Sequence, residues 1–517
     1  MANQAPGVNI NVSASASNPR GVVPTGTWFV LGVAAGPAGI AVPINSMADF
    51  NKYFGSIVNG SVSGRYTLNS HVDSTLLYDA LDVFFREGGV NAYVSRVQPT
   101  STGVAATSAT NGGKFLLTAK GKGTWANSSN SGASGVTLQI DGLTISGSTQ
   151  YRAIIRYNGN VLSSITGLTS DTDVINWVNS LPAYQSMVTA SAVSGTTVLP
   201  ATGDSVVVYL TGGTDISVAD TDVDAALAVF DGTFGPGQVS YPGNTGTVVA
   251  VKLSDHATAS NRVAVLDAPN TATTATLTAA VASLQAGSMD SSYASMFAPW
   301  LIVPGLVSTN PNAASGATFS RTVAPSALAA AKMAANDQSN DANVPAAGVA
   351  RGASSYAINV TQSYSAADLG DLNNAGVNIL RNVPNVNVIA IYGFRSCALD
   401  QNWAFLNNVR FRMQVTRDFD FIAESFVFQQ IDGKGHIFAT LNGALGGQCA
   451  AYWTRKSIYG ATASDAFTVN TGTLINTPAT IAAGQINAEV NLRMSPFGEF
   501  VTVNVTKYAV TAALPTI

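Results

Sequence analysis

A chain of 517 residues is longer than the roughly 250–300 residues that one hydrophobic core usually serves, so we expect two to four domains. Only 10% of the residues are charged, against about a quarter in typical globular proteins. The formal net charge of −4 gives no reason to expect non-specific binding to nucleic acid. So little charge suits either an assembly subunit or a monomer whose surface is rich in Gly, Ser, Thr and Asn.

The sequence shows no sign of export or of a membrane span. Residues 1–13 lack a basic stretch followed by an apolar core, so we expect no signal peptide. The most apolar run, residues 296–307, contains two prolines and is too short to cross a bilayer. Cys397 and Cys449 form no CxxC pair and are expected to be buried thiols. We therefore expect a soluble protein made in a cytoplasm.

Residues 1–22 are expected to form an extended arm. Val8, Ile10 and Val12 alternate with polar residues, which is the period of a half-buried strand. Such a strand pairs either within its own domain or with the sheet of a neighbouring subunit.

The next part of the chain predicts a βαβ-type arrangement. We expect strands at residues 27–33 and 92–97, with helices at 46–54 and 71–87 between them. Ser46 is expected to cap the first helix.

Residues 101–203 are expected to form a small β-rich insertion at the periphery, because Ser, Thr, Gly and Asn dominate its beginning. Within and just after it we expect a helix at 171–181 and strands at 136–140, 152–157 and 206–210, the last of which belongs either to the insertion or to the core. The α/β alternation then returns. We expect strands at 248–253 and 300–303 and helices at 271–285 and 325–335.

The C-terminal part predicts strands at 377–379 and 386–392, a helix after Asp400, and a helix at 435–453. It ends in a predicted hairpin. Residues 488–494 form one strand, and Val501, Val503 and Val505 alternate in the other.

No pattern of catalytic or cofactor-binding residues stands out. The three histidines share no ligand spacing, and the sequence has no phosphate loop, no dinucleotide fingerprint after a strand and no GxSxG elbow. The carboxylates are too scattered to nominate a catalytic pair. We therefore expect no enzyme, no cofactor and no metal, with a hydrolase of unknown type as a remaining alternative.

Several stretches, in order, resemble contractile tail sheath proteins of myophage tails and related contractile injection particles. They include TGTWFVLGVAAGPAG, FFREGGVNAYVSRV, LTGGTD, APSALAAAKMAANDQ and SPFGEF. The C-terminal pattern is carried by Gly376, Asn378, Arg381, Pro384, Gly393, Arg395, Trp403, Asn408 and Arg410. The family usually has a basic residue directly beside the last of these, where this chain has Phe411 and then Arg412. Residues 101–203 and both termini do not match in detail.

The resemblance implies a multidomain α/β (α+β) protein with a mixed-sheet core and no reaction to catalyse. Copies would stack as hexameric rings around a tail tube, with baseplate and tail terminator proteins as partners and neither nucleic acid nor membrane. The sheath would assemble in the host cytoplasm as part of a virion and contract to drive the tube through the target envelope. The implied parts are an arm at 1–22, a core at 23–100 and 204–345, the insertion at 101–203, an inner domain at 346–500, and a C-terminal strand and arm at 501–517.

Two sets of site residues follow from this reading. Val8, Ile10, Val12, Val501, Val503 and Val505 are candidates for strands added to neighbouring sheets. Arg410, Arg412 and Arg417 are candidates for a basic surface facing the tube, although a solvated helix face explains them as well. A Ser/Thr/Gly-rich surface adhesin, or another self-assembling structural protein, is the alternative function.

Overall fold

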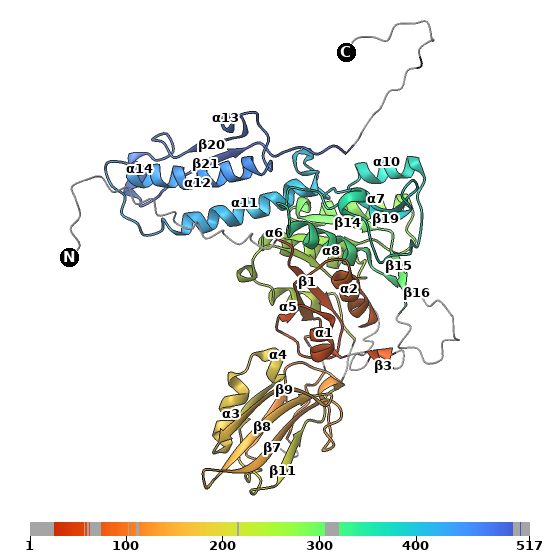
Figure 1. Ribbon diagram of the computed structural model, residues 1–517, viewed down its shortest axis with the longest axis vertical. Helices are drawn as coiled ribbons and strands as arrows, with labels where there is room; N and C mark the ends of the chain where they lie inside the picture. The colour runs from red at the N-terminus through yellow and green to blue at the C-terminus, as the bar shows by residue number, and fades with distance from the viewer. Residues whose placement is uncertain are drawn as a thin grey trace, which may run out of the picture. The chain divides into compact units, whose positions relative to one another are not determined.

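The computed structural model describes residues 25–55, 57–58, 61–62, 74–101, 103–109, 113–214, 217–305, 320–499 and 507. The chain divides into two compact units, a large unit (Met1–Phe421) and a C-terminal unit (Ile422–Ile517) (Figure 1). All six predicted arm residues lie outside the described residues: Val8, Ile10, Val12, Val501, Val503 and Val505. In the part that is described, no helix is both long and apolar enough to cross a membrane.

The large unit is built on an eight-stranded sheet among the described residues. Its strands are β1 (Trp28–Gly32), β2 (Val42–Ile44), β5 (Ala92–Arg96), β12 (Gln238–Ser240), β13 (Val263–Asp267), β14 (Ala294–Ala298), β18 (Val377–Val383) and β19 (Val388–Ile391). Their order across the sheet is β19-β18-β14-β13-β12-β1-β5-β2. The inner strands run parallel, and the two edge strands run antiparallel to their neighbours.

Helices cover both faces of this sheet (Figure 1). Trp28 and Val30 of β1 pack into a core with α1 (Met47–Phe54), α2 (Ser74–Arg86) and α8 (Pro325–Asp337). Phe29 and Leu31 point to the other face, which α5 (Asp222–Ala228), α6 (Thr247–Ala259), α7 (Thr274–Gly287) and α10 (Ala366–Asn374) cover. A parallel sheet needs this double cover because both of its faces are apolar.

The predicted βαβ arrangement is confirmed, because β1 and β5 are parallel neighbours. Ser46 caps α1 by accepting a hydrogen bond from the Asp49 N–H over 3.3 Å. Helices α7 and α8 are confirmed close to the predicted bounds, and α8 begins with Pro325 in its first turn.

One strand prediction is wrong. Residues 248–253, expected to be a strand, lie in helix α6. The β-branched run TVVAV favours a strand locally, but Val249, Leu253 and Ala257 recur every four residues and are buried against the sheet. The longer helical period decides the structure, which shows how packing overrides local propensity.

Residues 115–209 contain a four-stranded antiparallel sheet in the order β11-β7-β8-β9 and a separate pair β6-β10. Their elements are β6 (Phe115–Ala119), β7 (Val136–Ile145), β8 (Ser148–Tyr157), β9 (Asn160–Leu168), α3 (Asp171–Ser180), α4 (Ala183–Ser186), β10 (Val188–Ala192) and β11 (Ser205–Tyr209). Strand β11 pairs with β7, so the predicted strand at 206–210 belongs to this sheet, which runs past residue 203.

Smaller elements complete the large unit. They are β3 (Ile57–Val58), β4 (Ser61–Val62), β15 (Leu301–Pro304), β16 (Ser320–Val323), α9 (Gly348–Arg351) and β17 (Asn359–Val360). The predicted helix after Asp400 begins later than expected, as α11 (Leu406–Glu424), because Asp400 caps a short 3₁₀ turn instead.

The C-terminal unit contains α12 (His436–Thr454), α13 (Ala463–Ala466), β20 (Phe467–Asn470), α14 (Pro478–Ala482) and β21 (Glu489–Leu492). The predicted helix at 435–453 is confirmed as α12. Strand β21 confirms part of the predicted strand at 488–494, but its described partner is β20, which sequence reasoning missed. The other half of the predicted hairpin lies outside the described residues.

The contact between partly buried His256 and buried Arg262 generates a prediction about pH. Burial and the nearby Arg262 guanidinium lower the pKa of His256 to about 4, whereas an unperturbed histidine titrates near pH ~6.5. The unfolded chain therefore binds this proton first, and stability falls as the pH drops from about 6.5 towards 4. We expect a loss of about 2 kcal/mol by pH ~5, measured by urea unfolding.

His256→Gln is the matched variant, because its amide oxygen can still accept from Arg262, whose Nη1 lies 2.9 Å from His256 Nε2. It should lose stability less steeply over the same pH range. Equal slopes for the two proteins would contradict the assignment.

Candidate functional site

The C-terminal unit carries a sheet of only two strands, β20 and β21, among the residues that the structure describes. The less exposed face holds Phe467 and Val469 opposite Leu492 and Val490. Asn442 of α12 joins the sheet to the helix by donating to the Val469 carbonyl over 3.0 Å. No third described strand pairs with either outer edge, and two-stranded sheets are marginally stable by themselves. Because Asn442 already occupies the Val469 carbonyl of β20, the outer edge of β21 is the one that can accept a further strand.

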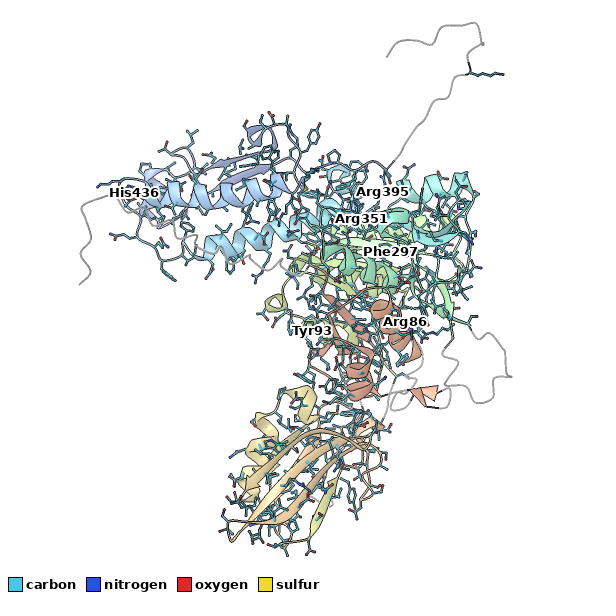
Figure 2. The ribbon with its side chains drawn as sticks, in the orientation of Figure 1. Arg86, Tyr93, Phe297, Arg351, Arg395 and His436 are labelled. Carbon is cyan, nitrogen blue, oxygen red and sulfur yellow. The ribbon has the colours of Figure 1, made fainter. Side chains whose placement is uncertain are left out.

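Helix α12 packs against this sheet with its apolar side and exposes small residues on its other side. Its buried residues recur every three or four positions: Ile437, Leu441, Leu445, Cys449 and Tyr452. The exposed side carries Ala439, Gly443, Gly447 and Ala451. Gly446 and Gly447 lie inside the helix. Figure 2 shows His436 at its N-terminal end.

The prediction that Arg410 faces the tube is wrong, because this side chain is buried. Arg410 is 0% exposed, and its Nη2 donates to Asp337 Oδ2 over 2.5 Å. Burial raises the pKa of Asp337, and the Arg410 guanidinium opposes that rise. The sequence pattern could not reveal this pairing, because the acidic partner lies on α8, far away in the sequence.

Arg412 is also held within the large unit. Its guanidinium lies over the rings of Tyr293 and Trp403, 4.1 and 4.2 Å from their centroids, and donates to Ser292 Oγ over 2.9 Å. With 20% of its side chain exposed, it offers little charge to a partner surface.

Arg417 differs from the other two predicted arginines. Its side chain is 45% exposed and lies 3.4 Å from Asp420, which is also exposed. Of the three, it is the one whose position fits a basic surface.

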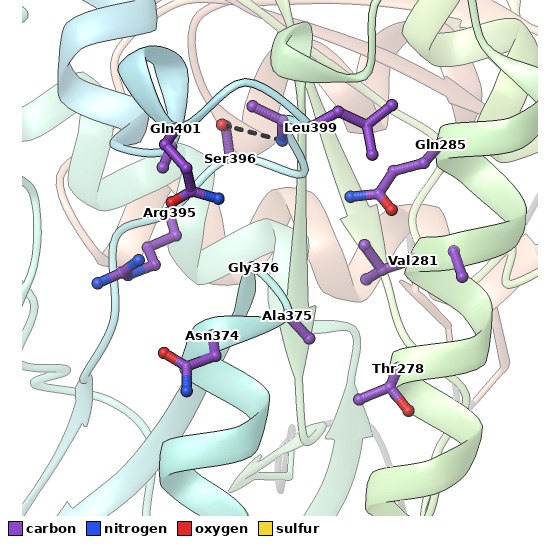
Figure 3. Close-up of a pocket in the computed structure, with 13 residues that line it drawn as sticks. Thr278, Val281, Gln285, Asn374, Ala375, Gly376, Arg395, Ser396, Leu399 and Gln401 are labelled. Carbon is purple, nitrogen blue, oxygen red and sulfur yellow. Dashed lines mark hydrogen bonds between the residues drawn. The ribbon is translucent and has the colours of Figure 1, made fainter.

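A pocket of about 230 Å³ lies between α7 and the segment that precedes β18 (Figure 3). Asn378, one of the residues of the sequence pattern, holds Arg395, which lines the pocket. Asn378 Oδ1 accepts from the Arg395 N–H over 2.6 Å, and its amide donates to the Arg395 carbonyl over 2.8 Å. Asn378 is fully buried. Asn378, which belongs to the pattern that resembles sheath proteins, therefore has a structural role and holds the loop at Arg395 in place.

The place where α/β sheets usually bind ligands is filled with side chains. Strand order reverses between β1 and β12, and ligands bind beyond the carboxyl ends of strands at such a point. Here Tyr241 follows β12 and is 2% exposed. At Gly243 a Cβ would lie 2.7 Å from Leu76 and 3.3 Å from Trp300. The reversal point therefore serves packing.

No protein-family model matches the sequence, and neither does any curated protein. Solved structures do match. A chain of the six-fold symmetrised baseplate of the anti-feeding prophage aligns over 98% of this chain and 100% of its own, with 16% identity and a TM-score of 0.53. The sheath tail protein of Listeria innocua aligns over 87% of this chain and 89% of its own, with 15% identity and a TM-score of 0.55.

A third structure, the contracted helical sheath of the anti-feeding prophage, aligns over 98% of this chain and 99% of its own, with 14% identity and a TM-score of 0.51. The chain has the fold of contractile sheath proteins. The mixed α/β class and the resemblance expected from the sequence are confirmed at this level. The sheath fold extends over the large unit and the C-terminal unit together.

The burial of Arg410 predicts a large effect on stability. Replacing it by Met leaves the Asp337 carboxylate buried without its charged partner, which typically costs about 3–5 kcal/mol. Arg417→Met is the matched control and should stay within about 0.5 kcal/mol of the parent, because this side chain is at the surface. Chemical denaturation followed by tryptophan fluorescence measures both, and equal effects would contradict the assignment.

Proposed function

We propose that the chain is the sheath subunit of a contractile tail or injection particle. Copies polymerise as stacked hexameric rings around a tail tube, and contraction drives the tube through the target envelope. The sheath fold over nearly the whole chain supports this proposal. Baseplate and tail terminator proteins are the proposed partners at the two ends of the polymer, and the virion or injection particle is the proposed location.

The observation that carries this proposal is the incomplete sheet β20–β21. A strand from a neighbouring copy can add to an open edge through main-chain hydrogen bonds. Residues 1–22 offer the required alternation, with Val8, Ile10 and Val12 on one side of the strand. These side chains would extend the apolar face that Phe467 and Val469 begin.

The free energy gained by adding the arm strand can be compared with the cost of ordering it. Burying one Val or Ile side chain contributes roughly 1.5–3 kcal/mol, while ordering one backbone residue costs about 1–2 kcal/mol. Three buried side chains, roughly 4.5–9 kcal/mol, therefore about offset the roughly 5–10 kcal/mol cost of ordering residues 8–12, and the main-chain hydrogen bonds of the added ladder contribute the remainder. Val501, Val503 and Val505 provide a second alternating segment for the same purpose.

The adhesin alternative is less well supported. It rested on the Ser/Thr/Gly-rich insertion, whereas the similarity to sheath structures spans the core and the C-terminal unit as well. We also propose that the chain is not an enzyme, in keeping with its sheath fold and its filled strand-reversal point.

Removing the arm tests the proposal. A chain lacking residues 1–20 should fold and remain soluble but form no tubes, because no strand reaches the neighbouring sheet. Negative-stain electron microscopy and sedimentation measure tube formation, and circular dichroism checks the fold. Normal tubes from the chain that lacks residues 1–20 would contradict the arm mechanism.

A matched pair of substitutions sharpens this test. Ile10→Asp with Val12→Asp places charge on the apolar side of the arm and should abolish tubes. Asn9→Asp with Asn11→Asp adds the same charge on the polar side and should leave assembly nearly intact. Equal loss in both variants would show that charge, rather than strand pairing, is responsible.

Arg417 provides a test of the tube contact. Arg417→Glu should reduce co-assembly with the tail tube protein about tenfold or more while leaving sheath-only polymers unchanged, because reversing a charge opposes an acidic partner surface. Asp420→Lys is the matched reversal of the opposite sign and should not weaken binding. Co-sedimentation with purified tubes measures both, and unchanged binding of Arg417→Glu would remove this residue from the interface.

A further inference from the structure

Asp337, the last residue of α8, accepts hydrogen bonds from two segments that are far apart in the sequence. Thr25 Oγ1 donates to Asp337 Oδ2, and Arg410 Nη2 donates to the same oxygen over 2.5 Å. Thr25 is 2% exposed, Asp337 7% and Arg410 0%. The shared oxygen is therefore shielded from water, where charge-assisted hydrogen bonds are strong.

Further contacts fix the chain at Thr25. Gln238 Nε2 donates to the Thr25 carbonyl over 3.1 Å. At the next residue, Gly26, a Cβ would lie only 2.8 Å from Ala334 Cα, so the backbone lies directly against α8. The base of the N-terminal segment is thus held on α8 before β1 begins.

Helix α11 reaches the same place with one polar face. Asn407, Arg410 and Gln414 are three and four residues apart and share that face. Gln414 Nε2 donates to Asp341 Oδ1 over 3.2 Å, and Asn407 Nδ2 donates to Asn343 Oδ1 over 3.2 Å. This face of α11 is therefore bonded to the end of α8 and to the turn that follows it.

The cluster is not fully satisfied. Asp337 Oδ1 and the Nε and Nη1 atoms of Arg410 are buried without a hydrogen-bond partner among the described residues. A partly satisfied buried network depends strongly on each bond that remains. Without the Thr25 hydroxyl, Arg410 would be the one of these two donors that still bonds to Asp337 Oδ2.

We propose that Asp337 is a positioning residue that couples the base of the N-terminal segment to α11, so that loosening Thr25 loosens the helix. Under the proposed function, on which the mechanical role rests, a neighbouring copy holds residues 1–22 and its pull arrives at Thr25. Asp337 then passes the pull to α11. This helix continues along the chain from the large unit into the C-terminal unit.

The test uses the full chain in dilute, unassembled form. Thr25→Val keeps the shape of the side chain and removes the donor. We expect amide hydrogen exchange in residues 407–415 of α11 to become about tenfold faster, the size expected for one hydrogen bond to a charged group. Thr25→Ser, which keeps the hydroxyl, should restore slow exchange.

The chain offers a matched control at the other end of α8. Ser326 Oγ donates to buried Asp267 over 2.8 Å. Ser326→Ala therefore removes the same kind of bond from the same helix, and it should leave exchange in α11 at the parent rate.

Coupling free energies are reciprocal, which gives a second and independent measurement. Arg410→Lys should accelerate exchange at residues 25–28 by a similar factor, and it decides the question if Thr25→Val does not fold. The proposal is overturned if α11 exchanges equally in Thr25→Val and Ser326→Ala, or if Arg410→Lys leaves residues 25–28 unchanged. Because assembly plays no part in these measurements, a failure to form tubes would count against the proposed function alone.

Discussion

A parallel sheet is apolar on both faces, and covering both faces determines how the large unit is built. Trp28 and Val30 face one helical layer, and Phe29 and Leu31 face the other. The sheet also protects its edges. Strand β2 carries Pro43 in its middle, and the β19 edge accepts from Ser354 N–H at the Ile389 carbonyl over 2.7 Å. In the β20–β21 pair, Asn442 covers the Val469 carbonyl of β20, whereas no described strand pairs with the outer edge of β21. The outer edge of β21 is therefore the one that suits the proposed strand addition.

The few charged residues are also distributed unevenly. Arg410 pairs with Asp337, Glu87 lies 2.7 Å from Lys332, and Arg321 is shared by Asp79 and Asp82 in partly or fully buried positions. Buried pairs position helices and strands more than they add stability. Because these charged residues are buried, the surface carries even fewer charges than the overall charged fraction of 10% implies. A surface with so little charge suits a subunit that neighbouring copies cover.

Local signals in the sequence were sufficient for the elements whose caps and periods agree. Ser46 before α1 and Pro325 at the start of α8 mark helix starts that the structure confirms. Helix α6 was predicted wrongly because its β-branched beginning conflicts with its longer period. β20 was missed because it is a strand of only four residues, although Phe467 and Val469 alternate with polar residues after a capping box at Thr462.

The site residues were harder to predict than the elements, because their roles depend on partners distant in the sequence. Arg410 and Arg412 look like a basic helix face until Asp337, Tyr293 and Trp403 are placed around them. No periodicity within α11 contains this information.

In the proposed assembly, the donated strand and its base would be held in different ways, and this difference would bear on contraction. A strand added to a sheet edge is held by main-chain hydrogen bonds spread along its length. The base at Thr25 depends on one side-chain bond to Asp337 together with the contacts of Gln238 and Gly26. In the proposed assembly, a pull on the arm would therefore reach Thr25 and Asp337 while the ladder holds. In the proposed mechanism, subunits linked in this way would reorient during contraction while the strands that join them stay in place.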